Sequence, residues 1–537
     1  MTRSSGGDCP HGFRGGWLTG DDAHRAAGRI SGPFRLPADA KLSWAEPRDL
    51  DDLVCLLEWS RREGRPLIAR GGGTGMPGGN LGPGVVVSLQ EGFGEVRPAR
   101  ASSDGGGTMR VGSGVIAGRV EEVAASRGLT LPCLPSSAPW ATIGGMVANN
   151  AAGARSFGHG AIHCWVEALE GVDANGTPFR CSREARGALR GEGGSTGCGA
   201  DHGLEGRMES WEPGLLPGDP DAPPWPSLRK NSSGYALDRV AGGGGLLDLL
   251  VGSEGTLALL TGVTLRLAPA PGARGVHLLP AATSAHATEL ALAAADLGAS
   301  ACEFLGRSFM EIAGLEEDPV VGTLAREARA LFLLEFEGTP EEVDQALDRA
   351  RELGAGLDGP GIGSREPELA TALWELRRGA SPMIAREARR GRVSTQFIED
   401  CVVPPEQLGS YLEGLEQILA EADIDAVVFG HAGDGNVHVN PLVPVDEADW
   451  EPRVRRVLDQ VVSLVTELGG TLAGEHGDGR LRAPFLQRIW GPRWAREFRE
   501  LKEHFDPEGR LNPGVILPLE GQDPLANLAP RPRSWPV

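Results

Sequence analysis

The chain has 537 residues, of which 40% are hydrophobic, and this is enough for two or three domains with a sizeable core. Its net charge of −21 argues against partners such as nucleic acid or anionic membrane surfaces, because both would repel it. The 79 glycines follow no period, which excludes collagen and indicates many turns and close backbone approaches.

Strand and helix patterns alternate along the first part of the chain. Residues 1–35 are Gly-rich and mixed in character, and we expect a loose arm with one short helix. A helical pattern then ends at Gly64, and residues 66–69 form a short apolar run typical of a buried strand. A Gly-rich loop and a second strand at 85–89 follow. The alternation indicates an α/β or α+β domain.

The middle of the chain changes character. Residues 182–230 are rich in Gly, Pro, Ser and acidic residues, so we expect an inserted, partly flexible surface excursion. Strand-like apolar runs resume at 246–260, and the Pro-Ala-Pro-Gly stretch at 269–272 indicates a domain boundary. Beyond it, the capping box from Thr339 to Glu342 predicts a helix, and helices and strands alternate.

Glycine is concentrated between Gly71 and Gly84, where it fills eight of fourteen positions just after a predicted strand. Such a loop can aim several backbone N–H groups at a pyrophosphate. It is neither a G-x-G-x-x-G nor a Walker motif, so a plain mobile loop is an equal alternative for this segment alone. Residues 135–153 again combine Gly, small residues and hydrogen-bonding side chains. Two such loops could clasp one large phosphate-bearing cofactor.

Three ordered motifs carry a specific resemblance. R-G-G-G-T-G (70–75), P-S-S-x-x-x-A-T-I-G-G-x-V-A-N-N-A-A-G (135–153) and V-G-S-E-G-T-L (251–257) resemble the FAD domain of the vanillyl-alcohol-oxidase flavoprotein superfamily. The resemblance implies an α+β fold, with an FAD-binding domain of two α/β subdomains and a C-terminal α+β substrate or cap domain. Thr74 stands where some relatives carry a His that binds FAD covalently, so non-covalent FAD is implied.

The resemblance also implies a division of the chain and a set of FAD contacts. The division is an arm (1–35), an FAD-binding domain (36–270) with the insertion at 182–230, a cap domain (271–500) and a C-terminal segment (501–537) that returns to the FAD domain. The residues implied to contact FAD are Arg70, Gly71, Gly72, Gly73, Thr74, Gly75, Gly78, Pro135, Ser136, Ser137, Thr142, Gly144, Gly145, Asn149, Gly153, Glu254, Gly255 and Asn512.

Two Gly-flanked histidine segments lie in the last quarter of the chain. In Gly430 to Asn440, a strand leads to His431, the Asp434-Gly435 pair predicts a tight turn, and a period of two follows. His431 could meet His438 across this turn, and Glu475-His476 adds a carboxylate and an imidazole. Two imidazoles with a carboxylate are typical of a divalent metal site with open positions; satisfied polar residues in turns are the alternative.

These segments resemble the C-terminal domain of the FAD-linked D-2-hydroxyacid dehydrogenases, which include D-lactate, glycolate and D-2-hydroxyglutarate dehydrogenases. The resemblance implies that His431, His438 and Glu475 bind a divalent metal, with zinc as the first expectation, and that His476 is the general base. It implies a pairing of Arg377 with the substrate carboxylate. Further substrate contacts are implied for Ser381, Asn440 and His476. Glu399-Asp400 resembles another signature of the family, without an assigned role.

The implied reaction is oxidation of a small D-2-hydroxy acid to the 2-keto acid by hydride transfer to flavin N5. A lysine of the hydroxyglutarate enzymes falls near Ile398 here, which disfavours a dicarboxylate. Because no iron–sulfur domain follows, we expect a separate electron acceptor: an iron–sulfur subunit, an electron-transfer flavoprotein, a quinone or a cytochrome. Two alternatives stay open, namely another flavin-dependent alcohol or aldonolactone oxidase of the superfamily and a non-catalytic flavin-bearing subunit of a multisubunit dehydrogenase.

The eight cysteines form no C-x-x-C pair, which argues against an iron–sulfur cluster and a disulfide framework. The N-terminus lacks the apolar stretch of a signal peptide, and no run of about 18 apolar residues occurs. We expect reduced thiols and a cytoplasmic protein that reaches a membrane only through a partner. The oligomeric state is left open, with a homodimer among the options.

Overall fold

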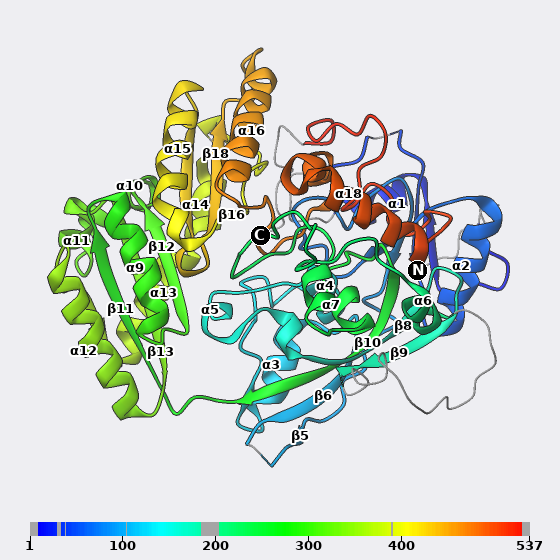
Figure 1. The fold of residues 1–537 in the computed structure, drawn as a ribbon, viewed down its shortest axis with the longest axis horizontal. Coiled ribbons are helices and arrows are strands. Elements are labelled where there is room, and N and C mark those ends of the chain that lie inside the picture. The colour runs from blue at the N-terminus through cyan, green and yellow to red at the C-terminus, as the bar shows by residue number, and fades with distance from the viewer. Residues whose placement is uncertain are drawn as a thin grey trace.

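The structure is a computed structural model that describes residues 9–28, 34–37, 39–103, 105–183, 203–387 and 390–528, with only the backbone of Ser381. The described residues form three sheets, two before residue 270 and one after residue 272 (Figure 1). The α+β prediction is therefore confirmed. Among the helices of these ranges, none combines the length and the apolar character needed to cross a bilayer. The cysteines within these ranges are free thiols.

The first sheet has the strand order β1-β2-β4-β3. β2 (Leu42–Glu46), β4 (Gly84–Ser88) and β3 (Leu67–Arg70) are parallel, and β1 (Gly16–Thr19) pairs antiparallel with β2. Helix α2 (Leu50–Glu63) packs on one face of this sheet, and α1 (Gly20–Ala27) packs on the other. The one short helix predicted within 1–35 is present as α1. The looseness of the arm is wrong for β1 and α1, because both bury apolar residues against this sheet.

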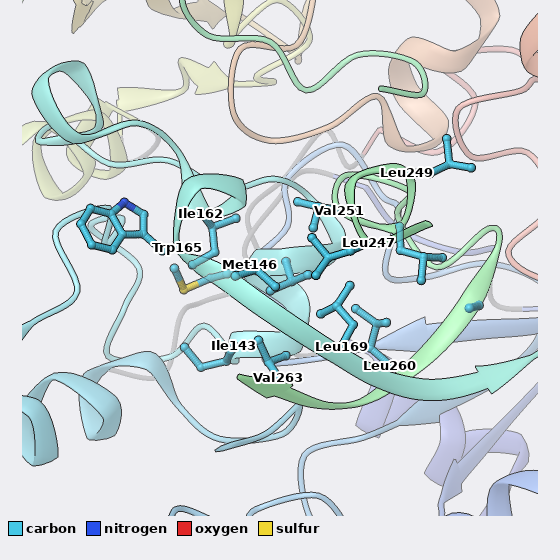
Figure 2. Packing of buried hydrophobic residues seen from close by; sticks show 14 of the residues in the cluster. Ile143, Met146, Ile162, Trp165, Leu169, Leu247, Leu249, Val251, Leu260 and Val263 are labelled. Carbon is cyan, nitrogen blue, oxygen red and sulfur yellow. The ribbon is translucent and has the colours of Figure 1, made fainter. Parts of the chain in front are cut away.

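The second sheet is antiparallel, with the order β5-β6-β10-β8-β9 and β7 paired to β10. Its strands are β5 (Arg100–Ala101), β6 (Gly107–Gly112), β7 (Leu129–Thr130), β8 (Val166–Asp173), β9 (Pro178–Ser182) and β10 (Ala258–Pro269). Its helices are α3 (Ala117–Ala125), α4 (Ile143–Ala148), α5 (Ser156–His159), η1 (Ile162–Trp165), α6 (Leu204–Ser210), α7 (Leu237–Ala241) and α8 (Leu246–Leu250). Figure 2 shows Ile143 and Met146 of α4 packing between Leu169 of β8, Val263 of β10 and Leu247 of α8.

The third sheet is antiparallel as well, with the order β14-β11-β13-β12-β17-β18-β15 and β16 paired to β18. Its strands are β11 (Ala273–Ala281), β12 (Ala301–Gly306), β13 (Ala330–Gly338), β14 (Ile362–Ser364), β15 (Val393–Ser394), β16 (Cys401–Val402), β17 (Asp425–His431) and β18 (Asn436–Val443). The turn predicted at Asp434-Gly435 joins β17 to β18, with Gly435 at φ 69°.

Helices cover both faces of this sheet (Figure 1). One layer consists of α9 (Ser284–Asp296), α12 (Pro340–Gly356), η5 (Pro405–Gln407), α15 (Leu408–Glu421) and α16 (Trp450–Glu467). The other consists of α10 (Arg307–Ala313), η3 (Leu315–Glu317), α11 (Gly322–Glu327), α13 (Pro367–Arg378) and α14 (Ala380–Glu387). The capping box predicted at Thr339 is present at the start of α12.

Two further predictions need correction. Residues 246–260 are not strands throughout, because α8 fills 246–250 before β10 begins. Within 182–230, the described part from residue 203 lies largely at the surface, as predicted, but it is packed onto the protein: the ring centroid of Trp225 is 4.5 and 5.0 Å from those of Trp490 and Trp494 of α18 (Leu486–Phe505). Residues 184–202 are outside the described residues. Aromatic stacking and burial fix this segment on α18 in spite of its polar composition.

Candidate active site

Three imidazoles meet around one carboxylate at the end of the third sheet. His431 ends β17, His438 lies in β18, and His476 follows Glu475 in the loop before α17 (Gly479–Arg482). The Nε2 atoms of His438 and His476 are each 3.3 Å from Oε1 of Glu475, and the Nε2 atom of His431 is 3.5 Å from Oε2. The structure thus brings the two histidine segments together as the sequence predicted.

Each of these rings is held at its other nitrogen by a protein acceptor. The carboxylate of Glu303 faces Nδ1 of His431, and the carbonyl oxygen of Glu399 lies 3.0 Å from Nδ1 of His438. Both carboxylate oxygens of Glu399 lie 3.0 Å from Nδ1 of His476. Because these oxygens accept, Nδ1 donates in each ring and every Nε2 atom faces Glu475.

The carboxylates around His438 and His476 favour the protonated forms of these two rings. Burial alone would lower the pKa of His438, but hydrogen bonds with Glu399 and Glu475 raise it to about 9. Burial opposes the charge of His476 in the same way, and the charges of Glu399 and Asp400 hold its pKa well above the usual value. Nearby opposite charges thus outweigh desolvation at both rings.

Asp400 and Arg482 fix the backbone that carries Glu475 and His476. The Asp400 carboxylate accepts from the backbone N–H of Glu475 at 3.1 Å and from that of His476 at 2.9 Å. Arg482 donates to Asp400 at 3.0 Å and also to Glu399. The Glu399-Asp400 signature, which the sequence left without a role, therefore positions the loop and the His476 ring.

Arg377, the predicted partner of the substrate carboxylate, reaches this cluster through Glu303. Its Nε atom donates to Oε2 of Glu303 at 2.6 Å, and its guanidinium lies 4.5 Å from the centre of the Phe429 ring. Burial raises the pKa of Glu303, but the charges of His431 and Arg377 lower it to about 2. Glu303 is a site residue that the sequence analysis missed, and its signal was a lone carboxylate within the apolar run 301–306.

The two other predicted substrate residues lie on adjoining elements. Asn440 is buried in β18, with its Oδ1 atom 3.4 Å from Nε2 of Gln396 and 3.5 Å from Oγ of Ser394. Ser381 lies in α14, directly after the helix that carries Arg377, and its side chain is outside the described part of the structure.

Lys230 is a second missed residue. It is buried, and its Nζ atom lies 2.6 Å from Oε2 of Glu475 and 3.3 Å from Oδ1 of Asn436. Burial disfavours the charge of Glu475, but Lys230 and His431 hold the pKa of this carboxyl well below its usual range. The composition of 182–230 gave no signal for such a site residue.

The two glycine-rich segments lie against each other in the first domain. A Cβ atom on Gly71 would lie 2.2 Å from Oγ1 of Thr142, and one on Gly72 would lie 2.0 Å from the carbonyl oxygen of Trp140. Thr142 also caps α4 by accepting from the N–H of Gly145 at 3.2 Å. Glycine is therefore required for this close approach, and the two backbones form one continuous surface.

The remaining residues predicted to contact the cofactor lie on these same loops or close by. Arg70 ends β3 and is buried, with its guanidinium 5.3 Å from the Trp44 ring centre. A Cβ on Gly153 would lie 2.0 Å from the carbonyl oxygen of Leu134, so the two ends of the second segment meet. Between or beside these points lie Gly73, Thr74, Gly75, Gly78, Pro135, Ser136, Ser137, Gly144 and Gly255.

Hydrogen bonds join the glycine-rich domain to the histidine cluster. Nδ2 of Asn149 donates to the carbonyl oxygen of His476 at 2.7 Å. The buried carboxyl group of Glu254 accepts from the backbone N–H groups of 478–479 at 2.7 and 3.0 Å. Asn512 donates to the carbonyl oxygen of Glu254 at 2.8 Å. A cofactor on the glycine loops and a substrate at the imidazoles would therefore lie at one site built from both domains.

The described residues contain one four-membered group whose potential ligand atoms lie within 4.8 Å of one another: Asp400, His438, Glu475 and His476. This grouping includes two of the three predicted ligands and leaves out His431, which faces the other oxygen of Glu475. The oxygens of Asp400 are already engaged by backbone N–H groups, Asn436 and Arg482.

Glycine loops suited to a phosphate-bearing cofactor thus lie beside a buried imidazole cluster, and the family matches identify the class as FAD-linked oxidoreductases. Residues 43–182 match the family described as FAD binding domain, and residues 270–516 match the C-terminal domain of FAD linked oxidases. The chain therefore belongs to the FAD-linked oxidases, and it binds FAD through its first domain.

Two curated relatives resemble the chain over most of its length. It is 29% identical to "Glycolate oxidase subunit GlcD" of Bacillus subtilis, covering 88% of either chain. It is also 29% identical to "D-lactate dehydrogenase" of Archaeoglobus fulgidus, covering 88% of this chain and 90% of that protein. Among solved structures, 4-ethylphenol oxidase from Gulosibacter chungangensis shares the fold, with a TM-score of 0.63 at 14% identity over 94% of either chain. The family and the fold implied by the sequence motifs are thus confirmed.

Proposed function

We propose that the protein oxidises a small D-2-hydroxy acid to the 2-keto acid. The observation that carries this proposal is the convergence of three Nε2 atoms on Glu475, with Arg377 held beside them through Glu303. The names of the relatives, which act on glycolate and D-lactate, support the same class of substrate.

The donor set fits a divalent cation. The Nδ1 atoms of His431 and His438 are bonded to acceptors of the protein, so their Nε2 atoms can ligate together with Glu475. We assign these three residues as ligands, and their mixture of imidazole and carboxylate suits Zn²⁺ or a similar metal. When bound, the cation would supply Lewis-acid polarisation of the substrate hydroxyl.

His476 is the base that removes the hydroxyl proton. Its Nδ1 atom is bonded to Glu399, so Nε2 is the nitrogen that accepts the proton when the ring is neutral, and Glu399 stabilises the imidazolium that forms. A cation bound at Glu475 would oppose the carboxylate charges that raise the pKa of His476 and would favour this neutral ring. Arg377 pairs with the substrate carboxylate and Asn440 orients the substrate. Bound FAD, held by the residues of the two glycine loops, supplies the hydride acceptor.

Uncharged groups around Asn440 favour a small monocarboxylate. The partners of its Oδ1 atom are Ser394 and Gln396. Ile398, near the position of the lysine in the hydroxyglutarate enzymes, is 1% exposed and packs in the apolar core. Its side chain therefore provides no charge for a distal carboxylate. We further propose that a separate acceptor takes the electrons and that the enzyme works in the cytoplasm.

Anaerobic titration of the holoenzyme tests the reaction. D-lactate and glycolate are expected to bleach the flavin absorbance within seconds, whereas L-lactate and D-2-hydroxyglutarate bleach it far more slowly. If no member of a panel of D- and L-2-hydroxy acids bleaches the flavin, the proposed substrate class is wrong.

A further inference from the structure

Glu303 links two groups that the proposed reaction uses for different purposes. It lies in β12 and is 1% exposed. One carboxylate oxygen faces Nδ1 of His431, and the other accepts from Nε of Arg377 at 2.6 Å. We infer that Glu303 is a positioning residue. It holds Arg377, which is proposed to bind the substrate carboxylate, and His431, a proposed metal ligand, in one fixed arrangement. This inference rests on the proposed function and deepens it.

The sheet places Glu303 at this point. β12 pairs antiparallel with β17 through Phe304 and Gly430, so Glu303 lies beside His431, the next residue of β17. Because side chains alternate along a strand, Glu303 projects to the same face as Ala301 and Leu305. Both of these pack in the cluster that includes Trp374 of α13, the helix that brings Arg377.

The geometry leaves the terminal nitrogens of Arg377 available to bind an anion. Glu303 uses only the Nε atom of Arg377, and within the described ranges no hydrogen bond of its two terminal nitrogens is seen. The Arg377 side chain is 14% exposed, and its guanidinium lies between the Glu303 carboxylate and the Phe429 ring. A guanidinium that is already oriented loses less conformational freedom when it pairs with a substrate carboxylate.

The same carboxylate orients His431. A carboxylate that accepts from the far nitrogen of a ligating imidazole fixes its tautomer and ring orientation, and loss of such a partner costs roughly 10- to 100-fold in metal affinity. The two carboxylate oxygens of Glu303 thus set the spacing between His431 and the Arg377 guanidinium. This spacing suits a substrate that carries its hydroxyl and carboxylate on adjacent atoms, as a 2-hydroxy acid does.

Glu335 provides a matched control on the same sheet. It is 2% exposed in β13, pairs with Arg155 and accepts from Nε1 of Trp374 at 2.7 Å. It is therefore also a buried carboxylate with a guanidinium partner, but its hydrogen bonds reach neither His431 nor Arg377. Glu335→Gln keeps an oxygen that can accept from Trp374, so it reports the cost of neutralising a buried carboxylate in this sheet while the bonds of Glu303 to His431 and Arg377 are kept.

The test measures two binding constants on the FAD-loaded enzyme. In Glu303→Gln, the Zn²⁺ dissociation constant from chelator competition is expected to rise roughly 10- to 100-fold. Oxalate binding to the metal-stripped holoenzyme, followed by the flavin spectrum, is expected to weaken about 10-fold, the loss typical of a displaced charged partner. Glu303→Asp keeps the charge, so its Zn²⁺ and oxalate dissociation constants should both rise, but by less than in Glu303→Gln. Glu335→Gln should change neither constant more than about twofold, the usual size of a neutral effect.

A double-mutant cycle with Arg377→Met completes the test. If Glu303 acts through Arg377, adding Glu303→Gln to Arg377→Met weakens oxalate binding no further. Either constant staying at its wild-type value in both Glu303 variants would overturn the inference. If the Glu303 variants bind Zn²⁺ and oxalate more weakly but no hydroxy acid bleaches the flavin, the result would count against the proposed reaction. The positioning role of Glu303 would still stand.

Discussion

Glu399→Gln tests whether the buried carboxylate behind His476 takes part in proton transfer. The substitution keeps the size of the side chain and removes its charge, so Nδ1 of His476 loses a charge-assisted partner at 3.0 Å. Hydrogen bonds to charged groups contribute about 1.5–3 kcal/mol. If this difference falls on the imidazolium formed during proton transfer, the rate of flavin reduction drops roughly 10- to 150-fold. Arg482 keeps its bonds to Asp400 and Gly477, which preserves the loop.

The assay is stopped-flow reduction of the bound flavin by D-lactate under anaerobic conditions. His476→Ala should lose at least about 100-fold, as expected for removal of a general base, while the yellow FAD stays bound. Because Glu399 acts through His476, the double variant should be no slower than His476→Ala alone. A Glu399→Gln enzyme that reduces its flavin at the wild-type rate, with Glu335→Gln as the comparison, would refute this reasoning.

Three further predictions concern the metal, the cofactor and pH. Removal of divalent cations by a chelator should slow flavin reduction at least 10-fold without releasing FAD, and Zn²⁺ or Mn²⁺ should restore it; unchanged reduction rates would contradict the metal assignment. Gly71→Ala places a Cβ atom 2.2 Å from Oγ1 of Thr142, so the purified variant should show a lower ratio of flavin to protein absorbance, whereas full FAD content would show that the loops can separate. Burial raises the pKa of Glu254 to about 8 from 4.5, so the folded protein holds a proton there that the unfolded chain has lost. Its contribution to stability is thus complete below about pH 4.5 and is lost as pH rises toward 8, and the melting temperature of the wild type relative to Glu254→Gln should fall across this window.

Local motifs made much of the fold predictable from the sequence. The helix that ends at Gly64, the capping box at Thr339 and the turn at Gly435 each depend on a few neighbouring residues, and each is present in the structure. The meeting of His431 with His438 was predictable for the same reason, because a tight turn fixes the register of the two strands. His431 pairs with Asn436 and His438 pairs with Phe429, so the two rings are diagonal neighbours with centroids 5.1 Å apart.

The outer part of the site was not predictable in this way. Glu303 and Lys230 reach the cluster from β12 and from the segment before α7, and no spacing in the sequence ties either one to the histidines. The packing of residues 203–230 was not predicted, because composition measures the average polarity of a segment. A few apolar side chains, among them Leu215 and Trp225, hold this segment on the protein. Long-range pairing of this kind is set by tertiary packing.

Contacts between the domains hold the loop that carries His476, the proposed base, against the FAD-binding domain. His476 contributes its ring to the cluster, but its own carbonyl oxygen accepts from Asn149 of the second glycine segment. The two residues after Gly477 donate to Glu254, which stands in the third FAD motif. The loop that carries Glu475 and His476 is thus anchored to the cofactor domain on one side and to Asp400 of the cap on the other. The position of the proposed base therefore depends on both domains, because the same backbone segment is bonded to each of them.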